Sequence, residues 1–416
     1  MDTIMQAVRL VENNQVEKAL EKLENFLPLA DEEEKYTIAQ LYLQWGYLTE
    51  SSEILHQLLE IYPEETELRI MLAQIYTELE QDEEAIQQLS MIDADDESYV
   101  QALVQLADLY QSQGIFEVAE QKLLTAKRIQ PDEKVIDFAL GELYYSIGEY
   151  QHAIVYYERL GQIEFAEVSI TERLAESYAS AGKYEEALQF YKESDLKTPD
   201  ALFKYGITAQ QAERSDIAIY TWEKVIHLDP YYHTAYYPLA KAYEEEELLD
   251  KAYKTAQKGL DMDEFNKELY YYAAILAKKL GKGQESEDLV RKSIALDPDY
   301  KEAILFLIAS LKDKNDSHGI IELVQEIQRT GAEDAAYDWE AATAFNQIES
   351  YEDALKYYQR AYINLKDDSE FLKEYGYFLS EEGRNAEACD VLRNYLEIVP
   401  TDIETEEFVH RLQQQS

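Results

Sequence analysis

Histidines and clustered carboxylates are the residues of this chain that could hold a metal ion or act as an acid or a base. The six histidines show no metal-ligand spacing such as H-E-x-x-H, and only His227 and His233 lie near each other, on either side of a turn. No cysteine or third histidine is close to this pair, so we expect no metal site there. The acidic runs at 31–34 and 244–247 lack the spacing and central glycine of a calcium-binding EF-hand, which favours solvated helix ends. The sequence therefore predicts neither a metal nor a cofactor.

A nucleophile or a phosphate-binding loop is equally hard to place. The one cysteine, Cys389, excludes an internal disulfide framework. It lies at helical spacing from Ala386 and Leu392, so its thiol should be buried and structural. No glycine-rich phosphate loop occurs, and the repeat described below leaves no segment for a catalytic domain. We predict that the chain is not an enzyme.

The charge of the chain limits the partners it can attract. Its 416 residues include 85 acidic and 38 basic side chains, a net charge of −47, and residues 1–100 carry 24 acids against 5 bases. Such a field repels phosphate backbones and anionic headgroups, so we expect no direct nucleic-acid or membrane-surface binding. It would attract basic protein surfaces, although an alternative role in solubility alone stays open.

The ends and apolar stretches of the sequence bear on its location. The opening residues lack a basic start followed by an apolar stretch, so no signal peptide is expected. The longest apolar stretch, AILFLIASL from Ala303, is too short to cross a bilayer. We therefore expect a soluble, cytoplasmic protein.

A regular series of small residues indicates the elements that carry these side chains. Nine of its eleven steps are 34 residues long, and the other two, from 7 to 39 and from 175 to 206, are 32 and 31. The members are Ala7, Ala39, Ala73, Ala107, Gly141, Ala175, Gly206, Ala240, Ala274, Ala342 and Gly376, with Ile308 in the one position that is not small.

Other residue types recur at fixed distances from each small residue. A second small site follows after twelve residues, a tyrosine is frequent after three, glycine or asparagine after seven, and proline after twenty-four. Apolar residues at helical spacing on both sides of the glycine predict two amphipathic helices per unit. The small sites let the two helices approach closely, and glycine or asparagine ends the first helix in the left-handed conformation. Proline ends the second helix or opens the next unit.

This pattern resembles the tetratricopeptide repeat family over residues 1–400. The resemblance implies an all-α fold, a right-handed α-solenoid superhelix of about twelve antiparallel hairpins, and it suggests a long all-repeat protein from a bacterium. The segment TEEFVHRLQQQS after Pro400 looks like a polar capping helix. We divide the chain into an acidic N-terminal array at 1–198, a C-terminal array at 199–400 and a capping helix at 401–416.

Three departures from the pattern carry their own expectations. The unit around Ile308 and Ile320 lacks both small sites, so its helices should lie further apart. The 31-residue step removes about one helical turn, which makes 195–203 the expected seam or hinge. Pro238 falls inside a first helix, which should begin late or kink.

The resemblance places partners along the concave face, which the first helices line. In the first half, the resemblance implies that a polar and acidic set of side chains points inward: Gln40, Gln74, Asp108, Glu142 and Glu176. Glu33, Gln44, Glu67 and Glu78 should lie close to them. In the second half the same strip gains lysines, namely Lys241, Lys278, Lys279, Lys312 and Lys373. Aromatic residues three positions before the small site accompany them: Phe203, Tyr237, Tyr271 and Trp339. These aromatics either pack between neighbouring repeats or form a lining that stacks on a peptide.

One family function can be tested on the residues directly. The clamp that binds chaperone C-termini needs a lysine three residues before the small site and an asparagine just after it. Only Lys373 supplies the lysine, and Tyr377 stands where the asparagine belongs. We therefore expect no chaperone-tail binding.

The leading interpretation is a scaffold that holds a protein or peptide with a basic surface, and such surfaces are common in nucleic-acid-handling complexes. An alternative is a sensor of short signalling peptides, although such receptors usually carry an N-terminal effector module and the repeat here begins by Ala7. An RNA-binding helical repeat is disfavoured because reading RNA needs a basic groove.

Overall fold

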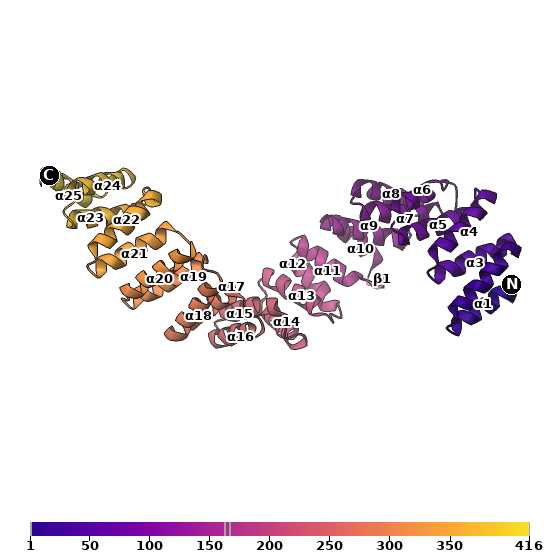
Figure 1. Cartoon of the computed structure of the whole chain (residues 1–416), viewed down its shortest axis with the longest axis horizontal. Helices are drawn as coiled ribbons and strands as arrows, with labels where there is room; N and C mark the ends of the chain where they lie inside the picture. Colours follow the sequence, from indigo (N-terminus) through magenta and orange to yellow (C-terminus); the bar gives the residue numbers. More distant parts are fainter. Residues whose placement is uncertain (1, 162–163, 166–167, 416) are drawn as a thin grey trace. The chain divides into compact units, whose positions relative to one another are not determined.

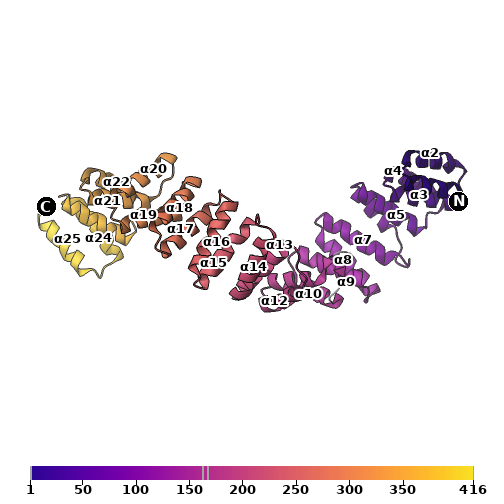
Figure 2. The same ribbon diagram turned by 90° about the horizontal axis from the view of Figure 1, so that it is seen from below.

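The computed structural model describes residues 2–161, 164–165 and 168–415, without the side chain of residue 415. It contains two compact units, Met1–Leu196 (unit 1) and Lys197–Ser416 (unit 2). Within each unit, helical hairpins stack in chain order (Figure 1), and the view turned by 90° shows the same neighbours (Figure 2). The expected all-α solenoid is confirmed.

Unit 1 contains six hairpins, whose first and second helices alternate. Their bounds are α1 (Asp2–Glu12), α2 (Val16–Phe26), η1 (Leu27–Leu29), α3 (Glu32–Gln44), α4 (Leu48–Ile61), α5 (Thr66–Glu78), α6 (Asp82–Ser90), α7 (Tyr99–Ser112), α8 (Phe116–Ile129), α9 (Lys134–Ser146), α10 (Tyr150–Leu160), β1 (Glu164–Phe165), β2 (Val168–Ser169), α11 (Ile170–Ser180) and α12 (Tyr184–Glu193).

Unit 2 contains six further hairpins and the expected capping helix, α25. The bounds are α13 (Pro199–Gln211), α14 (Ser215–Leu228), η2 (His233–Ala235), α15 (Tyr236–Glu245), α16 (Leu249–Met262), α17 (Lys267–Lys279), α18 (Gly283–Leu296), α19 (Lys301–Asp313), α20 (Ser317–Thr330), α21 (Ala335–Gln347), α22 (Tyr351–Leu365), α23 (Ser369–Glu381), α24 (Asn385–Ile398) and α25 (Ile403–Gln415).

The paired small sites meet where the two helices of a hairpin cross. The hydroxyl of Ser51 on α4 donates a 2.7 Å hydrogen bond to the carbonyl oxygen of Ala39 on α3, and Ser286 makes the same 2.7 Å bond to Ala274. All four residues are buried. A larger side chain at either site would hold the backbones apart, so the close crossing predicted from the sequence is confirmed.

Each hairpin turns at the residue seven positions after the first small site, and all twelve of these residues have positive φ. Eight of them are the glycines and asparagines that the sequence predicted for the left-handed conformation. The other four are glutamates, Glu80, Glu213, Glu247 and Glu349, with φ between 57° and 60°. At these four sites the tertiary packing holds a residue type that resists this conformation.

The three departures of the sequence have structural counterparts. Helices α19 and α20 carry Ile308 and Ile320. Their backbones lie close together over a shorter stretch than those of any other hairpin in the described chain. The helix with Pro238 begins late: a short 3-10 turn precedes α15, which has 10 residues where α13 and α17 have 13. The 31-residue step from Ala175 to Gly206 is one helical turn short, and α12, which lies within it, has only 10 residues. The two units divide between Leu196 and Lys197, and the flexibility of 195–203 stays a prediction.

One feature was not expected from the sequence. Between α10 and α11, β1 pairs with β2 antiparallel, and the ring of Phe165 stacks on Phe138 of α9 with centroids 4.9 Å apart. Short paired strands therefore interrupt the helical pattern of unit 1. No helix in the described part of the chain is both long and apolar enough to span a bilayer.

Candidate partner-binding site

The first half of the predicted groove divides into two parts. Gln40, Gln74 and Asp108 are exposed on α3, α5 and α7. Gln74 and Asp108 line one small pocket of about 190 Å³ together with Glu78, so the structure brings these three predicted residues together. The remaining two predicted residues, Glu142 and Glu176, lie one and two repeats further on.

Arg173 of α11 engages both of these glutamates. Its Nε donates to Glu142 at 2.9 Å and its Nη1 to Glu176 at 3.3 Å. The hydroxyl of Tyr157 also donates to Glu142, and that of Tyr145 donates to Glu176. Burial together with these carboxylates raises the pKa of both tyrosines. The guanidinium of Arg173 therefore offsets one of the two negative charges of Glu142 and Glu176, so this part of the strip is less acidic than its residue types suggest.

The lysines of the second half are largely paired with acids of adjacent repeats. The ion pairs are Lys278–Asp313 at 2.9 Å, Lys279–Glu244 at 2.5 Å, Lys312–Glu340 at 2.8 Å and Lys373–Asp402 at 2.7 Å. Of the five predicted lysines, only Lys241 has no ion pair among the described residues. Most of the basic strip is thus held by the protein's own carboxylates.

The rings of the predicted aromatic series in unit 2 pack against other aromatic rings. Tyr271 meets Tyr300 and Phe306 edge-on with centroids 5.4 and 5.7 Å apart, and Trp339 meets Phe371 at 5.5 Å. These contacts agree with packing between repeats, one of the two readings of the series. Tyr237 also contacts a ring, that of Tyr272, yet it stays 42% exposed.

The two positions of the chaperone clamp are occupied by the end of the array. Lys373 pairs with Asp402, directly before α25. The hydroxyl of Tyr377 lies 3.2 Å from that of Thr405 on α25, and its ring stacks on Phe408. Both side chains are therefore engaged by the capping helix and by the residue directly before it.

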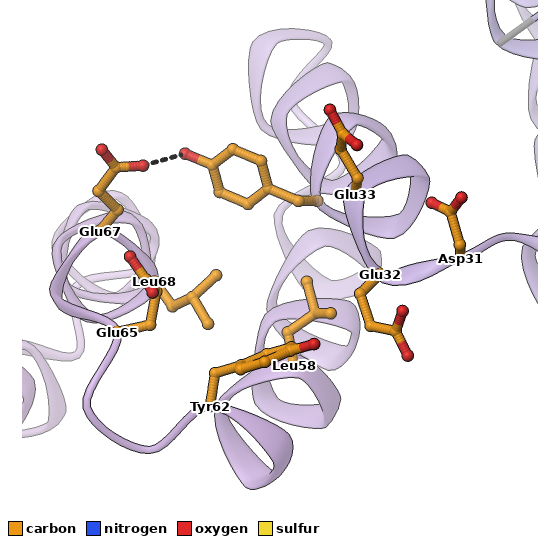
Figure 3. Close-up of a pocket in the computed structure, with 9 residues that line it drawn as sticks. Asp31, Glu32, Glu33, Leu58, Tyr62, Glu65, Glu67 and Leu68 are labelled. Carbon is orange, nitrogen blue, oxygen red and sulfur yellow. Dashed lines mark hydrogen bonds between the residues drawn. The ribbon is translucent and has the colours of Figure 1, made fainter.

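An acidic pocket of about 480 Å³ lies between α3 and α5 in unit 1. Figure 3 shows the first turn of α3 on one side, the start of α5 on the other and the Tyr62 ring between them. Its lining consists of five acids, two tyrosines and two leucines: Asp31, Glu32, Glu33, Glu65, Glu67, Tyr36, Tyr62, Leu58 and Leu68. We call these nine residues the acidic pocket.

The tyrosines of the acidic pocket have different surroundings. The hydroxyl of Tyr36 donates to Glu67 at 3.0 Å, and burial together with this carboxylate raises its pKa. Tyr62 follows the last residue of α4 and precedes Pro63, which forces it out of the helix, and the residue is 46% exposed. Leu58 and Leu68 are buried beneath them. The pocket thus has an apolar floor and one open aromatic face.

Most of the acids in this pocket are free to meet a partner. Asp31 caps α3, because its carboxylate accepts from the backbone N–H of Glu34 at 2.8 Å, so part of the charge serves the helix end. Among the described residues, the side chains of Glu32, Glu33 and Glu65 have no hydrogen-bond or ion-pair partner. Helix capping therefore accounts for only part of the acidic lining.

The lining suits an organic cation. Within the described chain, no three histidine, cysteine or carboxylate side chains are placed to share a metal ion. The aliphatic stem of a lysine or arginine side chain would lie on the leucines. Its charged end would lie among the carboxylates and near the face of the Tyr62 ring. Glu33 and Glu67 were predicted from the sequence to lie close to the groove, whereas Tyr62 and Glu65 were not. The Tyr62–Pro63 pair was the available signal, since the residue before proline leaves the helix.

Comparisons with known proteins point to one family. A model of YpiA-like tetratricopeptide repeats matches residues 111–165, and one of the YpiA-like C-terminal tetratricopeptide repeats matches 336–402. General tetratricopeptide repeat models match 46–107 and 171–199. The TPR repeat-containing protein YpiA of Bacillus subtilis (strain 168) is 40% identical over 418 residues, which cover 99% of each chain.

Solved structures with a similar fold share little sequence. YrrB, described as a TPR protein with an unusual peptide-binding site, is 15% identical with a TM-score of 0.38 and covers 44% of this chain and 95% of its own. The Naa15/Naa10 complex bound to HypK-THB is 15% identical with a TM-score of 0.42, over 92% of this chain and 66% of the matched one. At these values the likeness concerns the helical-repeat fold alone.

Proposed function

We propose that this chain, which belongs to the YpiA-like family of tetratricopeptide repeat proteins, is a non-enzymatic cytoplasmic scaffold that binds a basic segment of a protein partner on unit 1. The observation that carries this proposal is the acidic pocket, which Glu32, Glu33 and Glu65, without a partner among the described residues, line together with the half-exposed Tyr62. A cationic side chain would find carboxylates, an aromatic face and an apolar floor there.

The charge of the two units supports placing the partner on unit 1. Unit 1 carries 41 acidic and 13 basic residues, whereas unit 2 carries 44 and 25. Most of the predicted lysines of unit 2 are used in its own ion pairs. A basic segment is therefore steered more strongly toward unit 1, and the attraction weakens as salt shortens its range. A partner from a nucleic-acid-handling complex would have such a segment.

The proposal is tested with the full chain and a fluorescein-labelled twelve-residue peptide in which lysine alternates with serine. The triple variant Glu32→Gln, Glu33→Gln and Glu65→Gln should weaken binding at least tenfold, about 1.4 kcal/mol. The matched control is Glu83→Gln, Glu84→Gln and Glu97→Gln, which removes the same charge from exposed acids elsewhere in unit 1. It should change the affinity by less than about threefold, as expected for screened surface charges.

Equal effects of the two triple variants would reduce the interaction to general charge and overturn the proposed site. Tyr62→Leu keeps the charge of the pocket and removes the aromatic face. It should weaken peptide binding a fewfold relative to the unsubstituted chain. Binding of short uncharged peptides, accompanied by compaction of the chain in small-angle scattering, would instead favour the alternative, a sensor of short signalling peptides.

A further inference from the structure

An apolar groove in unit 2 lies outside the first-helix strip where partners were expected. It encloses about 340 Å³ between α18 and α20, the second helices of two successive hairpins. Its apolar lining is Ile294, Ala295, Pro298, Leu307, Leu323 and Ile327. We call this lining, with its polar edge, the α18–α20 groove.

The groove lies beside the one hairpin that lacks both small sites. Ile308 and Ile320 are buried where the other hairpins have small residues on at least one helix, and α19 and α20 approach each other least closely. Leu307, directly before Ile308, forms part of the floor. The departure from the repeat therefore coincides with an opening on the side of the second helices.

The groove has two charged edges of opposite sign. Arg291 of α18 and Glu326 of α20 both line it, and they make no ion pair with each other. Arg291 is held by Glu287 of its own helix at 2.9 Å and remains partly exposed. Glu326 is exposed and has no hydrogen-bond or ion-pair partner among the described residues. Arg291 and Lys314 share the single carboxylate of Glu287, so the wall at α18 keeps a net positive charge, whereas the wall at α20 is acidic.

We propose that the α18–α20 groove binds an amphipathic helix of a protein partner. One bulky apolar side chain of that helix would fill the pocket, an acidic side chain would face Arg291 and a basic side chain would face Glu326. Helices α18 and α20 use their own backbone groups internally, so an extended peptide would leave its N–H and C=O groups unpaired over the apolar floor. A helix satisfies these groups itself and needs only an apolar face.

The charges of the groove and of the whole chain favour this occupant over two others. A second copy of the chain carries the same net charge of −47, so long-range repulsion opposes it. A small apolar molecule would leave the exposed carboxylate of Glu326 without a counterpart. A helix with one acidic and one basic flank matches both edges at once.

The test uses the full chain and three labelled, stapled fourteen-residue helices with the same leucine and phenylalanine stripe. Their flanks carry glutamate and lysine, glutamate only, or lysine only. The mixed-flank helix should bind at least tenfold more tightly than either of the others in fluorescence anisotropy. Glu326→Lys makes both edges basic and should transfer the preference to the helix with two glutamate flanks.

Ala295→Trp fills the groove from its exposed wall without removing a buried side chain, so it should weaken the mixed-flank helix at least tenfold. Ala386→Trp, at another exposed alanine of unit 2, should leave the affinity within twofold. Circular dichroism checks that both variants stay folded. Absence of saturable binding, equal affinity for the three helices or no effect of Ala295→Trp would each overturn the proposal. A dimer in sedimentation that Ala295→Trp dissociates would also overturn it, because the occupant would then be a second copy.

Discussion

The indole of Trp222 on α14 fills the space that a Cβ atom at Gly206 on α13 would need. Its Nε1 donates a 3.3 Å hydrogen bond to the carbonyl oxygen of Phe203, one turn before the glycine. Trp222 is fully buried, so the largest side chain of its hairpin lies against the smallest. Gly141 stands against Tyr157 in the same way, with a Cβ position 2.5 Å from the ring. At both of these crossings the glycine makes room for the facing ring.

Gly206→Ala should lower the free energy of unfolding by about 1–3 kcal/mol, because the added methyl group overpacks a filled crossing. In the Trp222→Leu background the same change should cost much less, since leucine leaves room for it. Chemical denaturation of the two single variants and the double variant measures this coupling. Gly283→Ala is the control, because nothing lies near its Cβ position, and it should not destabilise the chain. Equal costs of Gly206→Ala in both backgrounds would contradict the steric explanation.

Glu247→Gly should stabilise unit 2 by about 0.5–1 kcal/mol. Glu247 has a φ of 60°, a backbone conformation that strains any residue except glycine. Glycine removes this strain, but part of the stabilisation is lost because its unfolded state has more conformational freedom. Glu322→Gly, at an exposed position inside α20, should instead destabilise by about 1 kcal/mol. Thermal denaturation of the two variants side by side provides the comparison. Destabilisation by Glu247→Gly would show that its side chain makes a compensating interaction.

Stability should fall as the pH rises from about 10 to 12. Burial, together with the neighbouring carboxylate of Glu158, raises the pKa of Tyr178 from 10.0 to about 12, and burial raises that of Tyr42 to about 12. A group whose pKa is raised by folding contributes stability below its unfolded pKa and loses that contribution as the pH rises toward the folded value. Tyr42→Phe should flatten this loss, whereas Tyr220→Phe, at an exposed tyrosine, should leave it unchanged. Denaturation midpoints between pH 8 and 12 decide the matter, and a flat profile for the unsubstituted chain would refute the claim.

Acid should weaken a contact between two repeats of unit 2. Hydrogen bonds from Lys314 and Arg291 lower the pKa of the half-buried Glu287 below its usual 4.5. Such a group stabilises the fold above its unfolded pKa, and the contribution disappears as the pH falls through the folded value. Lys314→Gln should therefore cost about 0.5–1 kcal/mol at pH 7, since Lys314 is partly exposed, and progressively less below pH 4.5. Urea titrations at pH 7 and pH 3.5 test this, and a cost that does not depend on pH would contradict it.

The repeat was predictable because its chemistry is local. Small residues such as Ala39 and Ser51 are needed wherever two helices cross closely, so their spacing identified every hairpin. Pro63 and Pro199 marked a helix end and a helix start, because proline lacks the N–H group that a helix interior requires. The late start of α15, which contains Pro238 in its first turn, followed from the same property.

The candidate site was only partly predictable, because pairing between repeats is not local. The sequence placed Glu33, Glu142 and Lys278 on one strip and could not tell a free charge from a paired one. Arg173 pairs with Glu142 across 31 residues and Asp313 pairs with Lys278 across 35, whereas Glu32, Glu33 and Glu65 have no such partner among the described residues. Such pairings depend on how two successive hairpins are rotated against each other.

The sequence by itself determined the number of hairpins, their boundaries and the acidic character of the first repeats. It could do so because helix crossings, turns and charge each depend on residue types at fixed short spacing. Only the tertiary structure decided which charges remain free, where Tyr62 opens a pocket and where the loosened hairpin at Ile308 leaves a groove. These features arise from the packing of one repeat on the next, which no single repeat encodes.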